Sequence, residues 1–112
     1  MAIVSVNCVT INAVDPAGLA AFWAALVGGS PRDAGNDFVL VEPGEGRIPL
    51  LFQKTDQRTP QPGWVHLDCS VPDREVAIEE IRRLGGTLVE RRGDSHGAWV
   101  VMADPEGNPF CI

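Results

Sequence analysis

The 112-residue sequence has no tyrosine, two histidines, three cysteines and fewer basic than acidic side chains. The cysteines, Cys8, Cys69 and Cys111, are odd in number and widely spaced, which argues against a disulfide framework and favours a reducing compartment. Nine Lys and Arg residues against 15 Asp and Glu residues give a formal net charge of −6. This balance argues against a nucleic-acid partner, because phosphate binding requires clustered basic side chains.

Long apolar runs are also lacking. No run approaches the roughly 18 residues that a membrane-spanning helix needs, and the first residues lack the charged-then-apolar pattern of a signal peptide. We therefore expect a cytoplasmic protein with no membrane partner. The apolar fraction of 45% is that of an ordinary globular protein, and 112 residues are enough for one domain with its own core.

The order of strand-like and helix-like segments predicts a first βαβββ module in residues 1–54. Its helix signal is the clearest in the chain, because Asp15 can cap a helix that starts with Pro16 and stops at Gly28. The remaining pattern predicts strands over residues 3–12, 30–36, 38–41 and 48–54.

A second module repeats this order in residues 64–112, after a breaker-rich linker in residues 55–63. Its helix is expected to start after Asp73 and to stop at Gly85. The strands are expected over residues 64–70, 87–90, 98–102 and 110–112.

An internal repeat would explain this duplicated order. Adding 58 to a residue number carries Cys8 to His66 and Gln53 to Cys111, whereas Phe38 pairs better with Trp99, 61 residues on. We therefore predict an α+β fold built from two tandem βαβββ modules that form one domain, residues 1–112.

His66 is the first candidate for chemistry, because it lies between the apolar residues Val65 and Leu67 of an expected strand. Asp68 follows two residues later and therefore shares a strand face with His66, where it could orient or charge-couple the imidazole. These two residues are our candidate catalytic pair for proton transfer. The alternatives are a histidine with a structural or ligand-orienting role and an exposed aspartate at a strand end. Cys69, on the other face, is expected to pack against the helices.

The motif order resembles that of the glyoxalase/bleomycin-resistance/dioxygenase superfamily, the vicinal oxygen chelate fold. The resemblance implies mixed sheets that curl around a cleft shared by the two modules, and often a homodimer. The matching segments are Asp15-Pro16-Ala17-Gly18-Leu19-Ala20-Ala21-Phe22-Trp23, Val65-His66-Leu67-Asp68, Leu84-Gly85-Gly86 and Asp104-Pro105-Glu106-Gly107-Asn108.

Metal-dependent members of that superfamily take two ligands, typically His and Glu, from each module. The resemblance maps these positions onto Cys8, Gln53, His66 and Cys111, of which only His66 keeps the usual ligand type. The missing carboxylates argue against glyoxalase I chemistry and against an iron dioxygenase, which needs two His and a carboxylate. A zinc site of Cys8, His66 and Cys111 is the alternative, weighed against simple packing of the two cysteines.

Two functions follow from this interpretation. The first is a protein that binds a small organic molecule in the cleft, with no cofactor and without the usual divalent metal. The second is an enzyme of the lyase, isomerase or dioxygenase kind that uses His66, with or without a Cys-ligated metal such as zinc. In either case the expected ligand pocket consists of Cys8, Phe38, Gln53, His66, Trp99 and Cys111.

Overall fold

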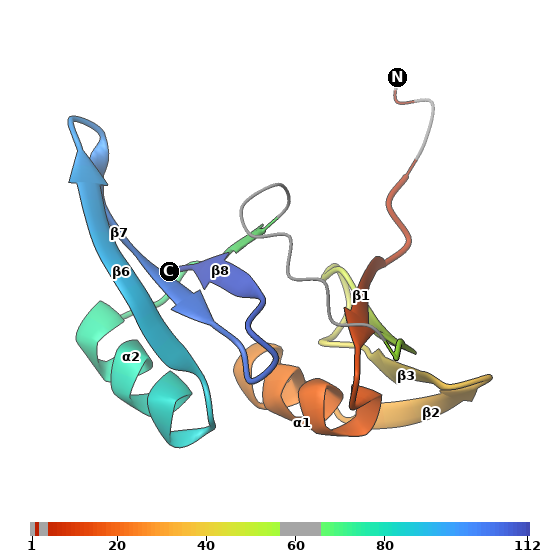
Figure 1. Ribbon diagram of the computed structural model, residues 1–112. Helices are drawn as coiled ribbons and strands as arrows, with labels where there is room; N and C mark the ends of the chain where they lie inside the picture. The colour runs from red at the N-terminus through yellow and green to blue at the C-terminus, as the bar shows by residue number, and fades with distance from the viewer. Residues whose placement is uncertain (1, 3–4, 57–65) are drawn as a thin grey trace. The chain divides into compact units, whose positions relative to one another are not determined.

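The computed structural model describes residue 2, residues 5–56 and residues 66–112, and the chain divides into two compact units, Met1–Arg58 and Thr59–Ile112. Both units have the predicted order βαβββ (Figure 1). We call them the first and the second module. Most of the expected linker, residues 55–63, and the beginning of the expected strand over residues 64–70 lie outside the described residues.

The first module is a four-stranded mixed sheet with one helix. Its sheet has the order β1-β4-β3-β2, in which β1 runs parallel to β4 and the other neighbours are antiparallel. The elements are β1 (Val9–Ala13), α1 (Pro16–Val27), β2 (Pro31–Gly35), β3 (Phe38–Val41) and β4 (Leu50–Lys54).

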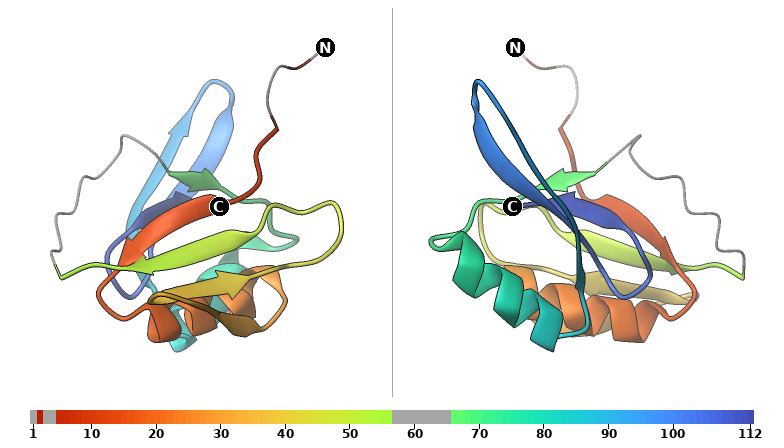
Figure 2. Two further views of the ribbon diagram at one scale, coloured as in Figure 1. Left: turned by 90° about the vertical axis from the view of Figure 1, so that its right-hand side faces the viewer. Right: turned by 60° about the vertical axis from the view of Figure 1, so that its left-hand side comes forward.

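The helix α1 begins where the sequence predicted. The carboxylate of Asp15 accepts a hydrogen bond from the Gly18 backbone amide at 3.1 Å, and Pro16 occupies the first helical position. The helix packs against its sheet through a buried face that includes Leu19 and Trp23 (Figure 2). Burial of this face, rather than helix propensity alone, stabilises the element.

The second module repeats the plan with the sheet order β5-β8-β7-β6, in which β5 runs parallel to β8. The helix α2 is capped at its start by the Asp73 carboxylate, 3.2 Å from the Val76 amide, and ends in a Schellman motif at Gly85 and Gly86. The elements are β5 (Leu67–Asp68), α2 (Arg74–Arg83), β6 (Thr87–Asp94), β7 (Gly97–Ala103) and β8 (Pro109–Cys111).

Some strand boundaries differ from the prediction. β1 starts at Val9, because its partner β4 starts at Leu50 and the described residues 5–8 have no strand opposite them. β5 keeps only two residues, since β8 ends at Cys111. β6 continues to Asp94, and its hairpin with β7 projects beyond the rest of the sheet (Figure 2).

Both sheets are open and uncurled, whereas the resemblance implied curled sheets. In the second module the two faces of the sheet differ in burial, because side chains alternate along a strand. Val100, Met102 and Phe110 are buried, while Trp99 and Cys111 on the opposite face are only half-buried. The candidate site residues Trp99 and Cys111 therefore lie on the half-buried face.

Among the described residues, no helix is long and apolar enough to span a membrane.

Candidate functional site

A cavity of about 720 Å³ lies on the half-buried sheet face of the second module. We call it the second-module cavity. Alternate residues of neighbouring strands reach it, as strand geometry requires. Its lining consists of His66, Asp68, Cys69, Arg74, Val89, Glu90, Arg92, Trp99, Val101, Pro109, Cys111 and Ile112.

Three lining residues form a compact cluster, His66, Asp68 and Cys111. The pairing of β5 with β8 sets Asp68 opposite Cys111, and His66 stands two residues before Asp68. His66 Nδ1 lies 3.1 Å from Asp68 Oδ1, so the predicted contact between these residues is present. One donor atom of each residue lies within 4.8 Å of the others. We call this group the His66–Asp68–Cys111 cluster.

The thiols of the cavity are held in their protonated form. Burial raises the pKa of the Cys111 thiol, and the charge and hydrogen bonding of Asp68 raise it further, although Arg92 acts in the opposite direction. Burial also raises the pKa of the Cys69 thiol, with smaller contributions from Asp68 and Cys111. Without an added cation, neither thiol is a thiolate at neutral pH.

The donor types of the cluster decide which metal it fits. An imidazole, a carboxylate and a thiol are all ligands that zinc accepts, and three protein ligands leave a fourth position open. The set has one histidine instead of the two found in non-haem iron sites, and one carboxylate instead of the several oxygen ligands that manganese favours. A zinc ion would fit His66, Asp68 and Cys111, and its charge would lower the thiol pKa.

The predicted pocket residues divide between the modules. His66, Trp99 and Cys111 are brought together in the second-module cavity. Cys8 and Gln53 belong to the first module: Cys8 is half-buried just before β1, with its Sγ 3.9 Å from Thr10 Oγ1, and Gln53 is exposed on β4. Asp68, rather than Cys8, is the residue that joins His66 and Cys111 in the cluster.

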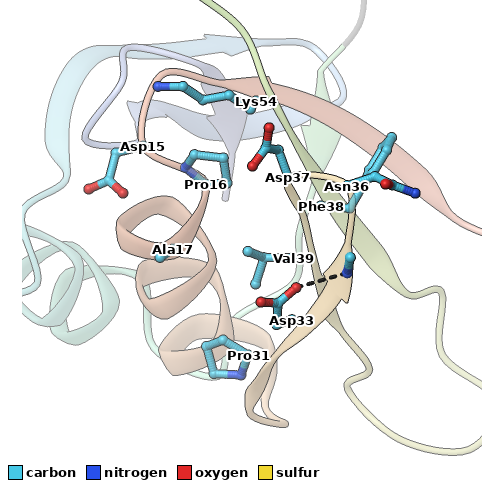
Figure 3. A pocket seen from close by; sticks show the side chains of 11 residues that line it. Asp15, Pro16, Ala17, Pro31, Asp33, Asn36, Asp37, Phe38, Val39 and Lys54 are labelled. Carbon is cyan, nitrogen blue, oxygen red and sulfur yellow. Dashed lines mark hydrogen bonds between the residues drawn. The ribbon is translucent and has the colours of Figure 1, made fainter.

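Phe38 borders a separate cavity of about 570 Å³ in the first module, between the start of α1 and the β2–β3 hairpin (Figure 3). Three of the polar side chains there are engaged in holding the fold. Asp15 caps α1, Asp33 Oδ1 accepts from the Gly35 amide at 2.8 Å, and the Lys54 ammonium donates to the Val14 carbonyl.

Sequence reasoning missed several lining residues. Cys69 was expected to pack against the helices, but β5 ends at Asp68, so strand alternation no longer sets the direction of Cys69, and the residue lines the cavity. Arg92 lies on the unpredicted extension of β6, and its alternation with Glu90 was the available signal. Arg74, the first residue of α2, carried no signal that pointed to a site.

The segment Asp104–Asn108, part of the resemblance, is a structural turn. Asp104 is 3% exposed, and its carboxylate accepts hydrogen bonds from the backbone amides of Glu106 and Asn108, each at 2.9 Å, and from the Asn108 side chain. These bonds satisfy a buried carboxylate, as buried charge requires. The turn connects β7 to β8 and so positions Cys111.

A family model described as a glyoxalase-like domain matches residues 8–112. The chain belongs to the glyoxalase-like family. The match covers both modules of the glyoxalase-like chain and the whole second-module cavity, and it confirms the resemblance to the vicinal oxygen chelate superfamily. No curated protein sequence matches the chain.

Solved structures share the fold at low sequence identity. A glyoxalase-related enzyme from Fulvimarina pelagi is 20% identical, with 96% of this chain and 86% of that chain covered and a TM-score of 0.73. A glyoxalase/bleomycin resistance protein/dioxygenase family enzyme from Burkholderia phytofirmans is 17% identical, with 97% of each chain covered and a TM-score of 0.70. A fosfomycin resistance protein from Listeria monocytogenes, complexed with Mn(II) and a dihydroxypropylphosphonic acid, is 15% identical, with 98% and 89% covered and a TM-score of 0.76.

Proposed function

We propose that this glyoxalase-like protein binds a small organic molecule in the second-module cavity, without the divalent-metal site of metal-dependent members. The observation that carries the proposal is the cavity itself. Its volume of about 720 Å³ is that of a small-molecule site, for which roughly 300–1,000 Å³ is usual. Of the four ligand positions that the resemblance implies, only His66 has the expected type.

The lining suits an amphipathic ligand. Trp99 and Val101, two residues apart on β7, offer an aromatic ring and an aliphatic surface to the apolar part of a ligand. His66 offers a hydrogen-bonding group for the polar part. Because Asp68 faces Nδ1, a proton is favoured on that nitrogen, which leaves Nε2 as the acceptor for a ligand.

Blocking the cavity tests the proposal. We would measure binding of benzoate, phenol and indole to the whole protein by saturation-transfer NMR, and then repeat it on Val101→Trp, which fills the cavity. Val76→Trp is the matched control, because Val76 is 59% exposed on α2 and does not line the cavity. We expect binding to be lost in the Val101 variant and kept in the Val76 variant. Equal binding by the two variants would contradict the proposal.

The His66–Asp68–Cys111 cluster favours a second candidate function, an enzyme of the lyase, isomerase or dioxygenase kind. Bound zinc would supply a Lewis acid that polarises a ligand oxygen. In either form of the enzyme, Asp68 orients the imidazole of His66, and His66 holds or accepts a proton at Nε2. The donor set is the reason to consider zinc. Among the described residues the cluster has one carboxylate and one histidine, which is the reason to rank this function second.

Elemental analysis tests the zinc form of the second function. The protein would be purified without chelator, together with His66→Ala and the control His96→Ala; His96 also lies near an aspartate, Asp94, but is 92% exposed and outside the cavity. Near-stoichiometric zinc that disappears only in the His66 variant would show a zinc site at the cluster and favour the zinc form of the second function. A metal-free wild type would exclude that form.

We also propose, from the resemblance and the composition, a cytoplasmic homodimer whose partner is a small molecule and not nucleic acid. Light scattering behind size exclusion tests the oligomeric state, and a monomer across the micromolar range would contradict it.

A further inference from the structure

The second-module cavity contains one ion pair, a carboxylate beside an imidazole, and one cation without an ion-pair partner among the described residues. Arg92 Nε lies 2.8 Å from Glu90 Oε2, and Asp68 Oδ1 lies 3.1 Å from His66 Nδ1. Arg74 also lines the cavity, but no carboxylate among the described residues forms an ion pair with it.

The hydrogen bonds of Arg74 are incomplete. One terminal nitrogen, Nη2, donates to the Ala98 carbonyl at 2.9 Å, which holds the guanidinium beside β7. Its Nε is buried and has no acceptor among the described residues. A buried N–H without an acceptor is unfavourable, and more so when it belongs to a charged group. The part of the chain that the structure describes therefore leaves this guanidinium without a full set of partners.

The acidic neighbour Glu75 interacts with the charge of Arg74 but forms no ion pair with it. Glu75, the next residue, is held by Arg91 through two bonds of 2.9 Å. Arg74 also occupies the first position of α2, where the helix dipole disfavours a cation. An arginine at this position is thus unfavourable for the helix, and an anion close to it would be favoured by both the guanidinium and the helix terminus.

We propose that the second-module cavity selects organic anions, with Arg74 binding the carboxylate, phosphonate or phosphate group of the ligand. This inference rests on the proposed function, because it names the ligand class of the same cavity. An anionic group in the cavity would supply the counter-charge that no ion pair among the described residues gives the guanidinium, and an arginine binds such groups through paired N–H donors. The apolar part of the ligand would lie toward Trp99 and Val101.

Calorimetric titration of the whole protein with three probes tests the proposal. Benzoate and benzylphosphonate are aryl anions, and benzamide is a neutral molecule of nearly the same shape as benzoate. We expect benzoate to bind at least about tenfold more tightly than benzamide, since a charge-assisted hydrogen bond is lost with the neutral probe. Tighter binding of the phosphonate than of the carboxylate would assign the site to doubly charged groups, and the reverse order would assign it to carboxylates.

Arg74→Gln should weaken benzoate binding by at least about tenfold and leave benzamide binding nearly unchanged. Arg82→Gln is the matched control, because Arg82 lies on the same helix but pairs with Glu79 away from the cavity. If Arg74→Gln does not fold, the wild-type protein still provides a test: the NMR signal of the Arg74 Nε–H should shift on addition of benzoate and not on addition of benzamide.

Equal affinities for benzoate and benzamide would overturn the inference while leaving the proposed function in place. Unchanged benzoate binding by Arg74→Gln would also overturn the inference, and so would an equal loss of benzoate affinity in Arg82→Gln. Benzoate binding that survives Val101→Trp would instead place the ligand outside the cavity and contradict the proposed function as well.

Discussion

The two modules have the same order of elements but differ in chemistry at the start of their first strands. In the first module Cys8 Sγ lies 3.9 Å from Thr10 Oγ1, a weak contact. Fifty-eight residues later, at the same place in the second module, His66 Nδ1 lies 3.1 Å from Asp68 Oδ1. One backbone plan thus positions a thiol and a hydroxyl in one copy and an imidazole and a carboxylate in the other.

The third member of the cluster shows the same contrast. In the second module the pairing of β5 with β8 sets Cys111 opposite Asp68. In the first module the pairing of β1 with β4 sets Leu51 opposite Thr10. Strand pairing requires only that the two residues share a face. The fold therefore tolerates a leucine in one module and a thiol in the other, and ligand chemistry can develop in one copy without a cost to the other.

The largest effect is expected where the modules are alike, in their cores. Phe52 and Phe110 are 0% and 1% exposed. Replacing either by alanine should reduce the free energy of unfolding by about 3–5 kcal/mol, measured by urea denaturation. Val76→Ala, at an exposed site, should change it by less than about 0.5 kcal/mol. If only one of the two replacements reduced the free energy of unfolding, the cores of the two modules would not be equivalent.

A smaller difference in stability is expected between the turns that precede the last strand of each module, β4 and β8. Asp104→Ala removes the acceptor of four hydrogen bonds in the second module and should cost about 1–3 kcal/mol in thermal or urea unfolding. The turn before β4 is held by a backbone bond from the Arg47 amide to the Gly44 carbonyl. Glu45→Ala, in that turn, should therefore change stability by less than about 0.5 kcal/mol. Equal losses of stability in Asp104→Ala and Glu45→Ala would contradict this difference between the two turns.

The thiols offer a chemical test of the comparison. Burial raises the pKa of Cys111, and Asp68 adds to the increase through its charge and hydrogen bond. Asp68→Asn removes the charge, so the pKa should fall, the thiolate fraction at pH 8 should rise, and alkylation of Cys111 by iodoacetamide should become faster. The rate is measured by mass spectrometry of the Cys111 peptide across pH. Glu79→Gln is the control. If it changes the alkylation rate of Cys111 as much as Asp68→Asn does, the effect of Asp68 on the Cys111 pKa is refuted.

The smallest effect concerns a surface pair of the second module. Hydrogen bonding to Arg91 lowers the pKa of Glu75, so the associated stabilisation is present above the pKa of the unfolded chain and is lost as pH falls through the folded value. Arg91→Gln should raise the pKa of Glu75 toward its ordinary range in an NMR titration, whereas Arg32→Gln, in the first module, should not change it. The predicted direction fails if Glu75 titrates at the same pH in the wild type and in Arg91→Gln.

The sequence predicted the elements well because their signals are local. The caps at Asp15 and Asp73 and the glycines at Gly28 and Gly85 all stand at helix ends in the structure. Strand lengths were less predictable, because they depend on the partner strand. β5 is short since β8 ends at Cys111, and no pattern within residues 66–70 indicates this.

The site was predictable only in part for the same reason. The His66–Asp68 contact follows from two-residue spacing along one chain segment. The predicted equivalence of Gln53 and Cys111 does not match the strand pairing. Leu51 is the residue of β4 that corresponds to Cys111 of β8, because connection lengths differ between the modules. Arg74 reaches the cavity from the start of a helix, and helix periodicity contains no information about a neighbouring sheet.

The central claim is that ligand chemistry resides in the second module. The most direct test is an amide and side-chain NMR titration of the whole protein with benzoate, mapped residue by residue. The account predicts shifts concentrated at His66, Trp99, Cys111 and the Arg74 side chain. Shifts concentrated around Phe38 and Lys54, which border the first-module cavity, would contradict it.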